Sequence, residues 1–173
     1  MQVHRSEELH LSAAVVAIGA FDGVHKGHQK VIQQMVEESK LRGVPSVIYS
    51  FYPPPRAYFQ GAQILSSRQE KINKFQKLGV DYAVIADFTD DYVRRSADLY
   101  IEELANINPN NIIVGENFRF GNKRAGDINL LKRYFSVNTI SPVCCSNGER
   151  ISSTRIRELI LQGKIDQAIP LLT

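Results

Sequence analysis

Short apolar segments alternate with amphipathic segments along this chain, and this alternation restricts the possible folds more than any other feature. The apolar segments are continuous rather than alternating, which is typical of strands buried on both faces of a sheet. We predict such strands over residues 13–18, 46–51, 82–86, 111–114 and 137–140. Helical patterns occupy residues 29–42, 67–78, 97–104, 127–134, 154–162 and 165–172. The sequence therefore predicts an α/β fold, Rossmann-like and doubly wound, with a central parallel sheet and helices on both faces.

Each unusual loop of the chain follows one of these predicted strands. The loops span residues 19–28, 52–56, 115–126 and 143–153. Ligands of parallel α/β sheets bind at the carboxyl ends of the strands, so we expect these loops to meet at one edge of the sheet. Pro53, Pro54 and Pro55 end the second strand, since consecutive prolines continue neither a strand ladder nor a regular helix.

The bulk composition indicates one globular domain over residues 1–173, with a polar segment at residues 1–12. Hydrophobic residues make up 43% of the chain and charged residues 23%, which are ordinary globular values. The net charge is only +3, and Lys and Arg never form runs longer than two, so nucleic acid is not an expected partner. These properties leave the oligomeric state open.

The expected location is the cytoplasm, with no membrane partner. No segment approaches the roughly 20 apolar residues that cross a bilayer, and the N-terminus lacks the apolar core of a signal peptide. Cys144 and Cys145 are adjacent, so they provide neither a disulfide framework nor a Cys-x-x-Cys site. We expect both cysteines to be reduced and to serve in packing.

A His-x-Gly-His motif, made by His25 and His28, ends the loop after the first predicted strand. The free N–H groups and the positive dipole end of a helix start point to one side, and Gly27 lets a phosphate approach the backbone. The motif therefore predicts a polyphosphate site in which the imidazoles donate hydrogen bonds. The simpler alternative to a phosphate site is that the histidines are polar caps of a helix and that the neighbouring glycines only form a turn. Zinc is less favoured, because the other histidines, His4 and His10, lie in the polar N-terminal segment.

A second motif precedes the helix predicted over residues 154–162. Hydroxyl residues, Ser153 and Thr154 among them, fit an N-cap, and Arg155 and Arg157 follow them. By itself this pattern is explained by capping and by solvated charges. This second motif and the histidine motif both follow strands of the same predicted sheet. We therefore favour the interpretation that the second motif is another helix start, which binds the far end of a triphosphate.

The third motif is the glycine-rich loop over residues 115–126. It carries Asn117, Phe118, Arg119, Phe120, Lys123 and Arg124. The simplest interpretation is a flexible surface loop. Two large aromatic side chains together with an amide and three cations are better suited to a flat, phosphorylated ligand. Neither Gly-x-Gly-x-x-Gly nor a Gly-Lys-Ser/Thr loop occurs, so the predicted phosphate site depends on the histidines.

Four motifs together resemble the FMN adenylyltransferase (FAD synthetase) domain of prokaryotic bifunctional riboflavin kinase/FAD synthetases. The motifs are Gly-x-Phe-Asp-Gly-Val-His-x-Gly-His from Gly19, Phe-x-Pro-x-Pro-Arg from Phe51, Val-Gly-Glu-Asn-Phe-x-Phe-Gly from Val114 with Gly-Asp downstream, and Ile-Ser-Ser-Thr-x-Ile-Arg from Ile151. The first and last motifs are typical of the wider nucleotidyltransferase superfamily with a His-x-Gly-His motif. The middle two motifs narrow the resemblance to the members of that superfamily that use a flavin as substrate. The resemblance covers residues 15 to 172.

The resemblance implies an enzyme, an FMN adenylyltransferase that uses ATP and FMN as substrates and forms FAD and pyrophosphate. The implied residues at the reaction centre are His25, His28 and Asn117. The implied ATP-binding residues are Gly19, Phe21, Asp22, Gly23, His25, His28, Arg150, Ser153, Thr154 and Arg157. The implied FMN-binding residues are Phe51, Pro53, Pro55, Asn117, Phe118, Arg119, Phe120 and Arg124.

The implied reaction is direct in-line attack of the FMN phosphate on the α-phosphorus, because no residue has the surroundings of an activated nucleophile. Mg²⁺ is expected to bridge the phosphates of ATP. The protein ligands of the metal stay unknown, and Asp22 is the one carboxylate considered as such a ligand. Histidines and a helix start would neutralise the charge that spreads over the phosphate oxygens.

Two features depart from the family pattern. Pro54 stands where the family usually has His, and no riboflavin kinase domain follows residue 173, so we expect no riboflavin kinase activity. Two alternatives therefore stay open. One is a nucleotidyltransferase of the same fold with another phosphorylated acceptor. The other is a flavin or nucleotide sensor that binds without turnover.

Overall fold

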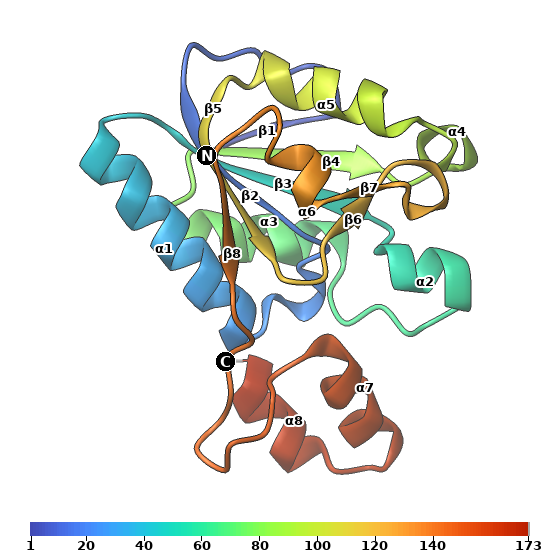
Figure 1. Cartoon of the computed structure of the whole chain (residues 1–173). Coiled ribbons are helices and arrows are strands. Elements are labelled where there is room, and N and C mark those ends of the chain that lie inside the picture. Colours follow the sequence, from blue (N-terminus) through green and yellow to red (C-terminus); the bar gives the residue numbers. More distant parts are fainter. Residues whose placement is uncertain (173) are drawn as a thin grey trace.

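Residues 1–172, which the computed structural model describes, form a layered α/β structure around a central parallel sheet (Figure 1). The strands of this sheet are β1 (Gln2–His4), β2 (Ala14–Ile18), β3 (Ser46–Tyr52), β4 (Tyr82–Asp87), β5 (Pro109–Gly115) and β8 (Val137–Ile140). Their spatial order is β1-β4-β3-β2-β5-β8, and all neighbours pair in parallel. The predicted parallel sheet is confirmed, and the predicted strands agree with β2, β3, β4, β5 and β8 within two residues at each end.

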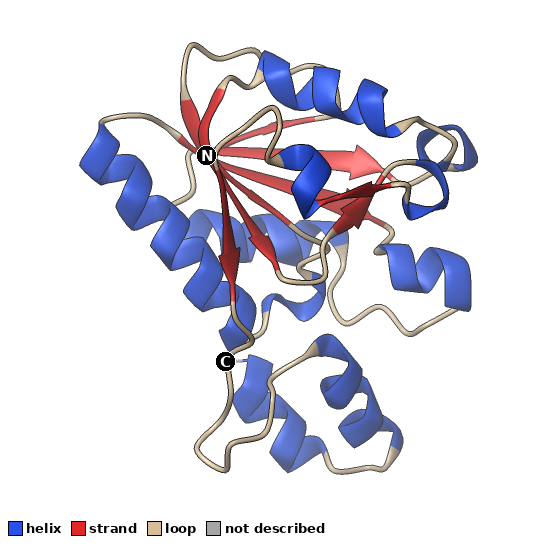
Figure 2. Ribbon diagram, viewed as in Figure 1, coloured by secondary structure: helices blue, strands red, loops and turns tan. Residues whose placement is uncertain are grey.

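Helices connect the strands and lie on both sides of the sheet (Figure 2). The longer helices are α1 (Lys26–Arg42), α3 (Arg68–Lys77), α5 (Ala97–Asn106), α7 (Ser153–Leu161) and α8 (Ile165–Leu172). The shorter ones are η1 (Asp22–Val24), α2 (Pro55–Gln60), α4 (Asp90–Val93), η2 (Asn122–Arg124) and α6 (Ile128–Leu131). A small antiparallel hairpin joins β6 (Arg119–Phe120) to β7 (Gly126–Asp127).

The strand order places the carboxyl ends of β2 and β5 at a topological switch point. From β2 the chain moves outward through β3 and β4, and it then returns to the other side of β2 to add β5 and β8. The connections after β2 and β5 therefore leave in opposite directions. A crevice opens between such connections, and it is the usual ligand site of an open α/β sheet.

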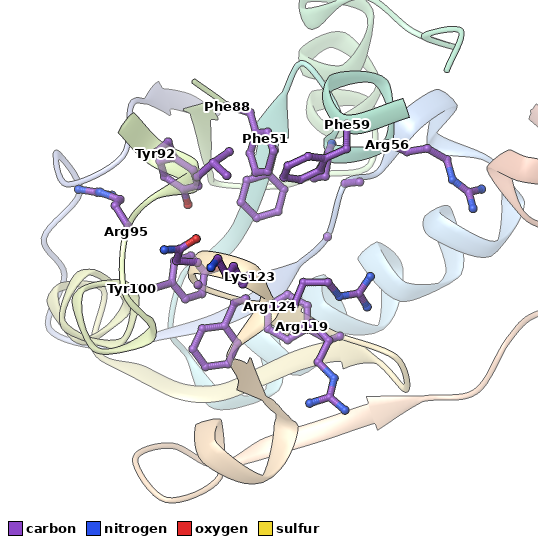
Figure 3. A pocket seen from close by; sticks show the side chains of 18 of the residues that line it. Phe51, Arg56, Phe59, Phe88, Tyr92, Arg95, Tyr100, Arg119, Lys123 and Arg124 are labelled. Atoms are coloured by element: carbon purple, nitrogen blue, oxygen red, sulfur yellow. The ribbon is translucent and has the colours of Figure 1, made fainter. Parts of the chain in front are cut away.

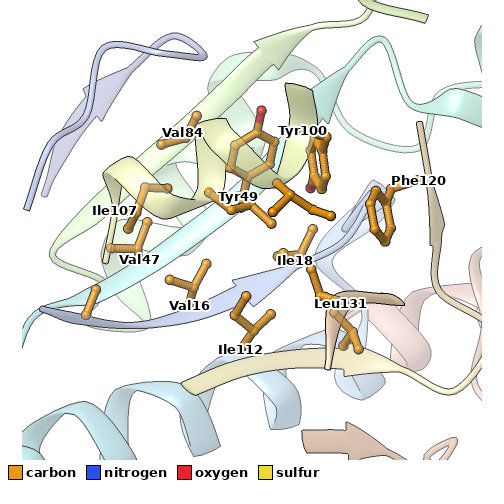
Figure 4. Close-up of a cluster of buried hydrophobic side chains, with 14 of the residues drawn as sticks. Val16, Ile18, Val47, Tyr49, Val84, Tyr100, Ile107, Ile112, Phe120 and Leu131 are labelled. Atoms are coloured by element: carbon orange, nitrogen blue, oxygen red, sulfur yellow. The ribbon is translucent and has the colours of Figure 1, made fainter. Parts of the chain in front are cut away.

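Alternate side chains of the strands enter two separate apolar cores. On β2, Val15 and Ala17 face the core that includes Ile32 of α1 and Phe75 of α3. Val16 and Ile18 belong to the opposite core, where Tyr49, Tyr100, Leu104 and Leu131 are buried (Figure 4). Because both faces of the central strands are covered, their residues are apolar at consecutive positions.

The helix boundaries follow local signals. Gly43 ends α1 in the left-handed conformation, with φ of 65°. Ser67 and Glu70 form a reciprocal capping box at the start of α3. These contacts confirm the predicted helices at residues 29–42 and 67–78, although α1 begins three residues earlier, because His25 acts as its N-cap.

Several segments differ from the sequence-based expectation. The proline run does not exclude a helix, because Pro55 occupies the first turn of α2, where its missing N–H costs nothing. The loop at residues 115–126 contains the β6–β7 hairpin and η2. The polar N-terminal segment contributes β1, which pairs with the edge of β4. The helix expected at residues 127–134 is only the short α6.

The last two helices, α7 and α8, pack against one another below the carboxyl edge of the sheet (Figure 1). They share a small core made by Ile151, Ile156, Leu159, Ala168 and Leu171. Among the described helices, none combines the length and apolar character needed to cross a membrane.

Candidate active site

The turn between β2 and α1 has an unusual backbone. Phe21, Gly23 and Val24 all have positive φ, at 45°, 79° and 46°. For the branched Val24 this conformation is strained, and such strain persists only where the surrounding structure enforces it. Glycine is favoured at position 23, because its φ of 79° lies in the left-handed region. The strained turn brings the His-x-Gly-His motif to the carboxyl end of β2.

His25 and His28 form a stacked pair at the start of α1. Their ring centroids are 3.5 Å apart and their planes differ by 16°. The backbone N–H of His28 donates to Nδ1 of His25 over 3.2 Å, so the proton of a neutral His25 ring lies on Nε2. Phe21 supports the pair from the other side, with its ring edge-on to His28 at 5.2 Å. Gly27 makes room for the pair, since a Cβ there would lie 3.2 Å from the His25 ring.

Both imidazoles are neutral at pH 7. Burial lowers the pKa of His25 to about 4, and the charges of Arg150 and Lys74 act in the same direction. Burial also lowers the pKa of His28 well below its ordinary value, with His25 and Lys71 contributing. Nδ1 of His28 is buried and has no hydrogen-bond partner within residues 1–172. The pair can therefore donate hydrogen bonds to an anion but carries no charge of its own.

A buried ion pair joins α7 to the turn. Nη2 of Arg157 lies 2.5 Å from Oδ2 of Asp22, and the two side chains are 9% and 3% exposed. The N–H groups of Leu65 and Ser66 also donate to the Asp22 carboxylate. Ser153 Oγ donates to the Asp22 carbonyl at 3.0 Å. The Asp22 carboxylate is thus occupied by protein donors, which argues against the metal ligation considered from sequence.

The described residues contain no group of three His, Cys, Asp or Glu side chains that could hold a metal ion. A magnesium ion at this site would therefore depend on phosphate oxygens for most of its ligands.

One cavity of about 480 Å³ lies between the His-x-Gly-His turn and α7; we call it the histidine cavity. It brings together most of the residues expected at the ATP side, namely Gly19, Phe21, Asp22, His25, His28, Arg150, Ser153, Thr154 and Arg157. Gly23 is the exception, because it is not one of the described residues that line this cavity. Its N–H donates to Ser66 and its carbonyl accepts from Lys74, so it supports the turn from behind.

A second cavity of about 740 Å³ lies beside the first and is bordered by β3, α2, α4, α5 and the 117–124 loop; we call it the aromatic cavity (Figure 3). Residues expected at the FMN side line it, namely Phe51, Pro55, Asn117, Phe118, Arg119, Phe120 and Arg124. Pro53 is absent from the described lining of both cavities, whereas Pro54 and Pro55 line the histidine cavity.

The aromatic cavity also contains residues that the sequence reasoning missed. These are Phe59, Phe88, Tyr92, Arg95 and Tyr100, among others (Figure 3). Phe88 and Tyr92 follow the carboxyl end of β4, so the rule applied to the loops after the other strands would have found them. Phe59 and Tyr100 lie on helices that no sequence motif marks.

A buried polar network supports this wall of the aromatic cavity. Tyr49 Oη donates to Glu103 Oε1 at 2.5 Å and lies 2.8 Å from Tyr92 Oη. Arg95 donates to the other Glu103 oxygen at 2.7 Å. The Arg95 carbonyl in turn accepts from the N–H of Asn122 at 2.7 Å. The network thus connects the core of the sheet to the loop that closes the cavity.

Positive charge surrounds both cavities, but some of it is already paired. Arg95 pairs with Glu103, and Arg119 lies 3.2 Å from Asp127. Four cations that line the cavities form no salt bridge within residues 1–172, namely Arg56, Lys123, Arg124 and Arg150. The combined site therefore favours anionic ligands.

The two cavities are adjacent because they share part of their lining. The shared residues are Gly19, Ala20, Pro55, Arg56, Asn117 and Phe118. One cavity offers neutral donors at a helix start, and the other offers aromatic faces. The arrangement can place a polyphosphate next to a flat aromatic ligand.

Comparison with known proteins agrees with this geometry. The family model described as FAD synthetase matches residues 7–155. A Geobacillus thermodenitrificans protein, provisionally named as a bifunctional riboflavin kinase/FMN adenylyltransferase, is 51% identical over 173 residues, which are 99% of this chain and 97% of that protein. The FAD synthetase of Listeria monocytogenes is 35% identical over 92% of this chain and 68% of its own length.

Longer relatives also match. The bifunctional riboflavin kinase/FMN adenylyltransferase of Escherichia coli K12 is 31% identical over 98% of this chain, and the match spans 57% of that protein. A crystal structure from Streptococcus pneumoniae, described as a macrolide-efflux protein, has a TM-score of 0.84 and 27% identity over 99% of this chain and 61% of its own. The matching family model and relatives show that the chain belongs to the FAD synthetase family.

Proposed function

We propose that this chain transfers the AMP group of ATP to FMN, giving FAD and pyrophosphate. The observation that carries the proposal is the adjacency of the histidine cavity and the aromatic cavity, with Asn117 in the wall they share. Flavin is flat and aromatic, and ATP is a polyphosphate, so the chemistry of each cavity suits one substrate. The names of the relatives, which include FMN adenylyltransferase and FAD synthetase, support the same assignment.

In the proposed step an oxygen of the FMN phosphate forms a bond to the α-phosphorus of ATP. The bond from that phosphorus to the bridging oxygen breaks, and its electron pair leaves with pyrophosphate. The FMN phosphate is already an anion, so general-base help is unnecessary. The protein must instead hold two anions in line and stabilise the charge that develops on the equatorial oxygens.

The histidine pair supplies this stabilisation. With its Nδ1 engaged by the helix, His25 keeps its proton on Nε2, and His28 lies directly against it. Fixed neutral donors stabilise developing negative charge without reorganising. Asn117 contributes an amide at the boundary between the two substrates. Ser153, Thr154 and Arg150 hold the far end of the triphosphate, and Mg²⁺ enters with ATP as part of the substrate complex.

Arg157 has a positioning role in this scheme. Its guanidinium is paired with Asp22 and donates to the Gln63 carbonyl at 2.7 Å, so it holds α7 against the turn. The cations Lys123 and Arg124 line the aromatic cavity, where they attract the phosphorylated flavin.

The proposal is tested with purified protein, MgATP and FMN, followed by chromatography for FAD and an assay for pyrophosphate. We expect both products in equal amounts. FMN binding without product would contradict the proposal and indicate a flavin sensor. Product with another phosphorylated acceptor but not with FMN would indicate a different nucleotidyltransferase.

A variant of the histidine pair sharpens this test. His28→Ala should lower turnover by about 10²-fold or more, the order expected when one charge-stabilising donor is lost. His10→Ala is the matched control, because His10 is exposed in the N-terminal segment and should leave turnover unchanged. Unchanged turnover in His28→Ala would show that the His28 side chain does not stabilise the transition state.

A further inference from the structure

The boundary between the two cavities contains one charged side chain to which no role has yet been assigned. Of the described residues that line both cavities, Arg56 is the charged one; the others are Gly19, Ala20, Pro55, Asn117 and Phe118. Arg56 belongs to the first turn of α2 and is exposed. It forms no salt bridge within residues 1–172, so its charge is available to a ligand.

The side chain of Arg56 spans the boundary. Its backbone lies at the rim of the aromatic cavity, and the side chain extends away from the aromatic rings (Figure 3). Its Nη1 donates a hydrogen bond to Oγ1 of Thr154 at the start of α7. Thr154 lines the histidine cavity, so the guanidinium lies on the polyphosphate side while its backbone lies on the flavin side.

Other cations near the site are less well placed for this boundary. Arg157 and Arg95 are each paired with a buried carboxylate. Lys123 and Arg124 line the aromatic cavity only, and Arg150 lines the histidine cavity only. Arg56 is thus the available cation next to both ligands.

We propose that Arg56 is a further catalytic residue, whose guanidinium binds the acceptor phosphate and holds it beside the α-phosphate of ATP. This inference rests on the proposed function. Both reacting groups are anions, and their repulsion is greatest when they are at bonding distance. A planar guanidinium can donate two parallel hydrogen bonds to phosphate oxygens, which fixes direction as well as charge. The contact with Thr154 orients the guanidinium before the acceptor arrives.

The test compares Arg56→Met, Arg56→Lys and the control Arg133→Met, an exposed arginine that lines neither cavity. FAD formation gives kcat and the KM for each substrate. Quenching of flavin fluorescence gives the affinities for FMN and for riboflavin, which has no phosphate. Arg56→Met should lower kcat by about 10²-fold and leave riboflavin affinity unchanged. Arg56→Lys should recover part of the loss, because it keeps the charge without the planar donor pair.

The outcomes separate this inference from the proposed function. If Arg56→Met keeps the kcat of the unmodified protein, Arg56 does not act in the reaction. If the unmodified protein forms no FAD, the proposed function fails, and the binding data then decide the role of Arg56. A loss of FMN affinity with riboflavin affinity retained would still assign the phosphate contact to Arg56. Equal losses for both flavins, or none for either, would overturn it.

Discussion

At the scale of single residues, the site depends on side chains whose pKa values are lowered by burial. His25 and His28 are neutral at pH 7, because burial lowers the pKa of both rings, and His25 and Lys71 act in the same direction on His28. Lys71 is fully buried and donates to the carbonyls of Ala20 and Phe51 at 2.8 and 2.9 Å, and burial lowers its pKa to about 8. Lys71 thereby ties together the carboxyl ends of β2 and β3. The neutral histidines supply donors to the site, whereas Lys71 has a structural role, because its ammonium also donates to Ser50 Oγ at 2.8 Å.

The histidine pair predicts a specific loss of stability in acid. The pKa of His25 is about 4 in the folded protein and near 6.5 when unfolded, so the unfolded state binds more protons between these values. The stability due to neutral His25 is present above pH 6.5 and is lost as the pH falls toward 4, on the order of 3 kcal/mol in total. Urea unfolding over this pH range measures the loss.

His25→Asn is the matched variant, because Asn also caps a helix but does not titrate. Its free energy of unfolding should fall less than that of the unmodified protein over the same pH range. Parallel pH profiles for the two proteins would show that His25 is not held neutral by the fold.

At the scale of elements, the aromatic cavity is built where a loop meets the start of α5. Gly121 has φ of 73°, and a Cβ there would lie 2.8 Å from the backbone nitrogen of Ala97. The Asn122 N–H donates to the carbonyl of Arg95 just before α5. The close approach of two backbones fixes the loop that carries Lys123 and Arg124.

Gly121→Ala should therefore destabilise the protein by about 2 kcal/mol or more, because neither backbone can move aside. Gly148→Ala is the matched control, since Gly148 has φ of 76° but a Cβ there would meet nothing within 4 Å. That control should show only the cost of the left-handed backbone, about 1 kcal/mol. Thermal unfolding and FMN affinity would be measured for both, and equal effects would mean that the contact with Ala97 is not tight.

At the scale of the whole molecule, the two-helix unit of α7 and α8 is held in place by polar contacts and by the packing of Leu65 against its core. The Asp22–Arg157 pair is buried, and Ser153 donates to the Asp22 carbonyl. Gln29 also donates to the carbonyl of Leu172 at 3.2 Å. The histidine cavity lies between this unit and the sheet, so its shape depends on how firmly the unit is attached.

Arg157→Ala should loosen this attachment. Removing one partner leaves the Asp22 carboxylate buried without its cation, a change that costs about 3–5 kcal/mol. Amide hydrogen exchange should increase first in α7 and α8 and only later in the sheet. Arg155→Ala is the control, because Arg155 contacts Cys145 and Glu149 within the C-terminal segment. Uniform exchange across the chain would show that the pair stabilises the whole fold rather than the attachment.

The sequence by itself determined the parallel sheet, its strands β2, β3, β4, β5 and β8, the longer helices and the place of the His-x-Gly-His motif at a helix start. Burial on both faces requires continuous apolar strands, and a helix start next to glycine and histidine is a local property. Local signals could not identify β1, because Gln2–His4 has one apolar residue, Val3, and is a strand only through its pairing with β4. Nor could they exclude Asp22 as a metal ligand, since its partner Arg157 is 135 positions away.

Only the tertiary structure decided which residues share a cavity. Phe59 of α2, Phe88 of the loop after β4 and Tyr100 of α5 line one cavity at the carboxyl edge of the sheet. The burial that keeps the histidines neutral, the stacking of their rings and the place of Arg56 between two cavities likewise depend on packing. Distances between residues remote in sequence follow from how the elements pack, and neither periodicity nor a motif contains that information.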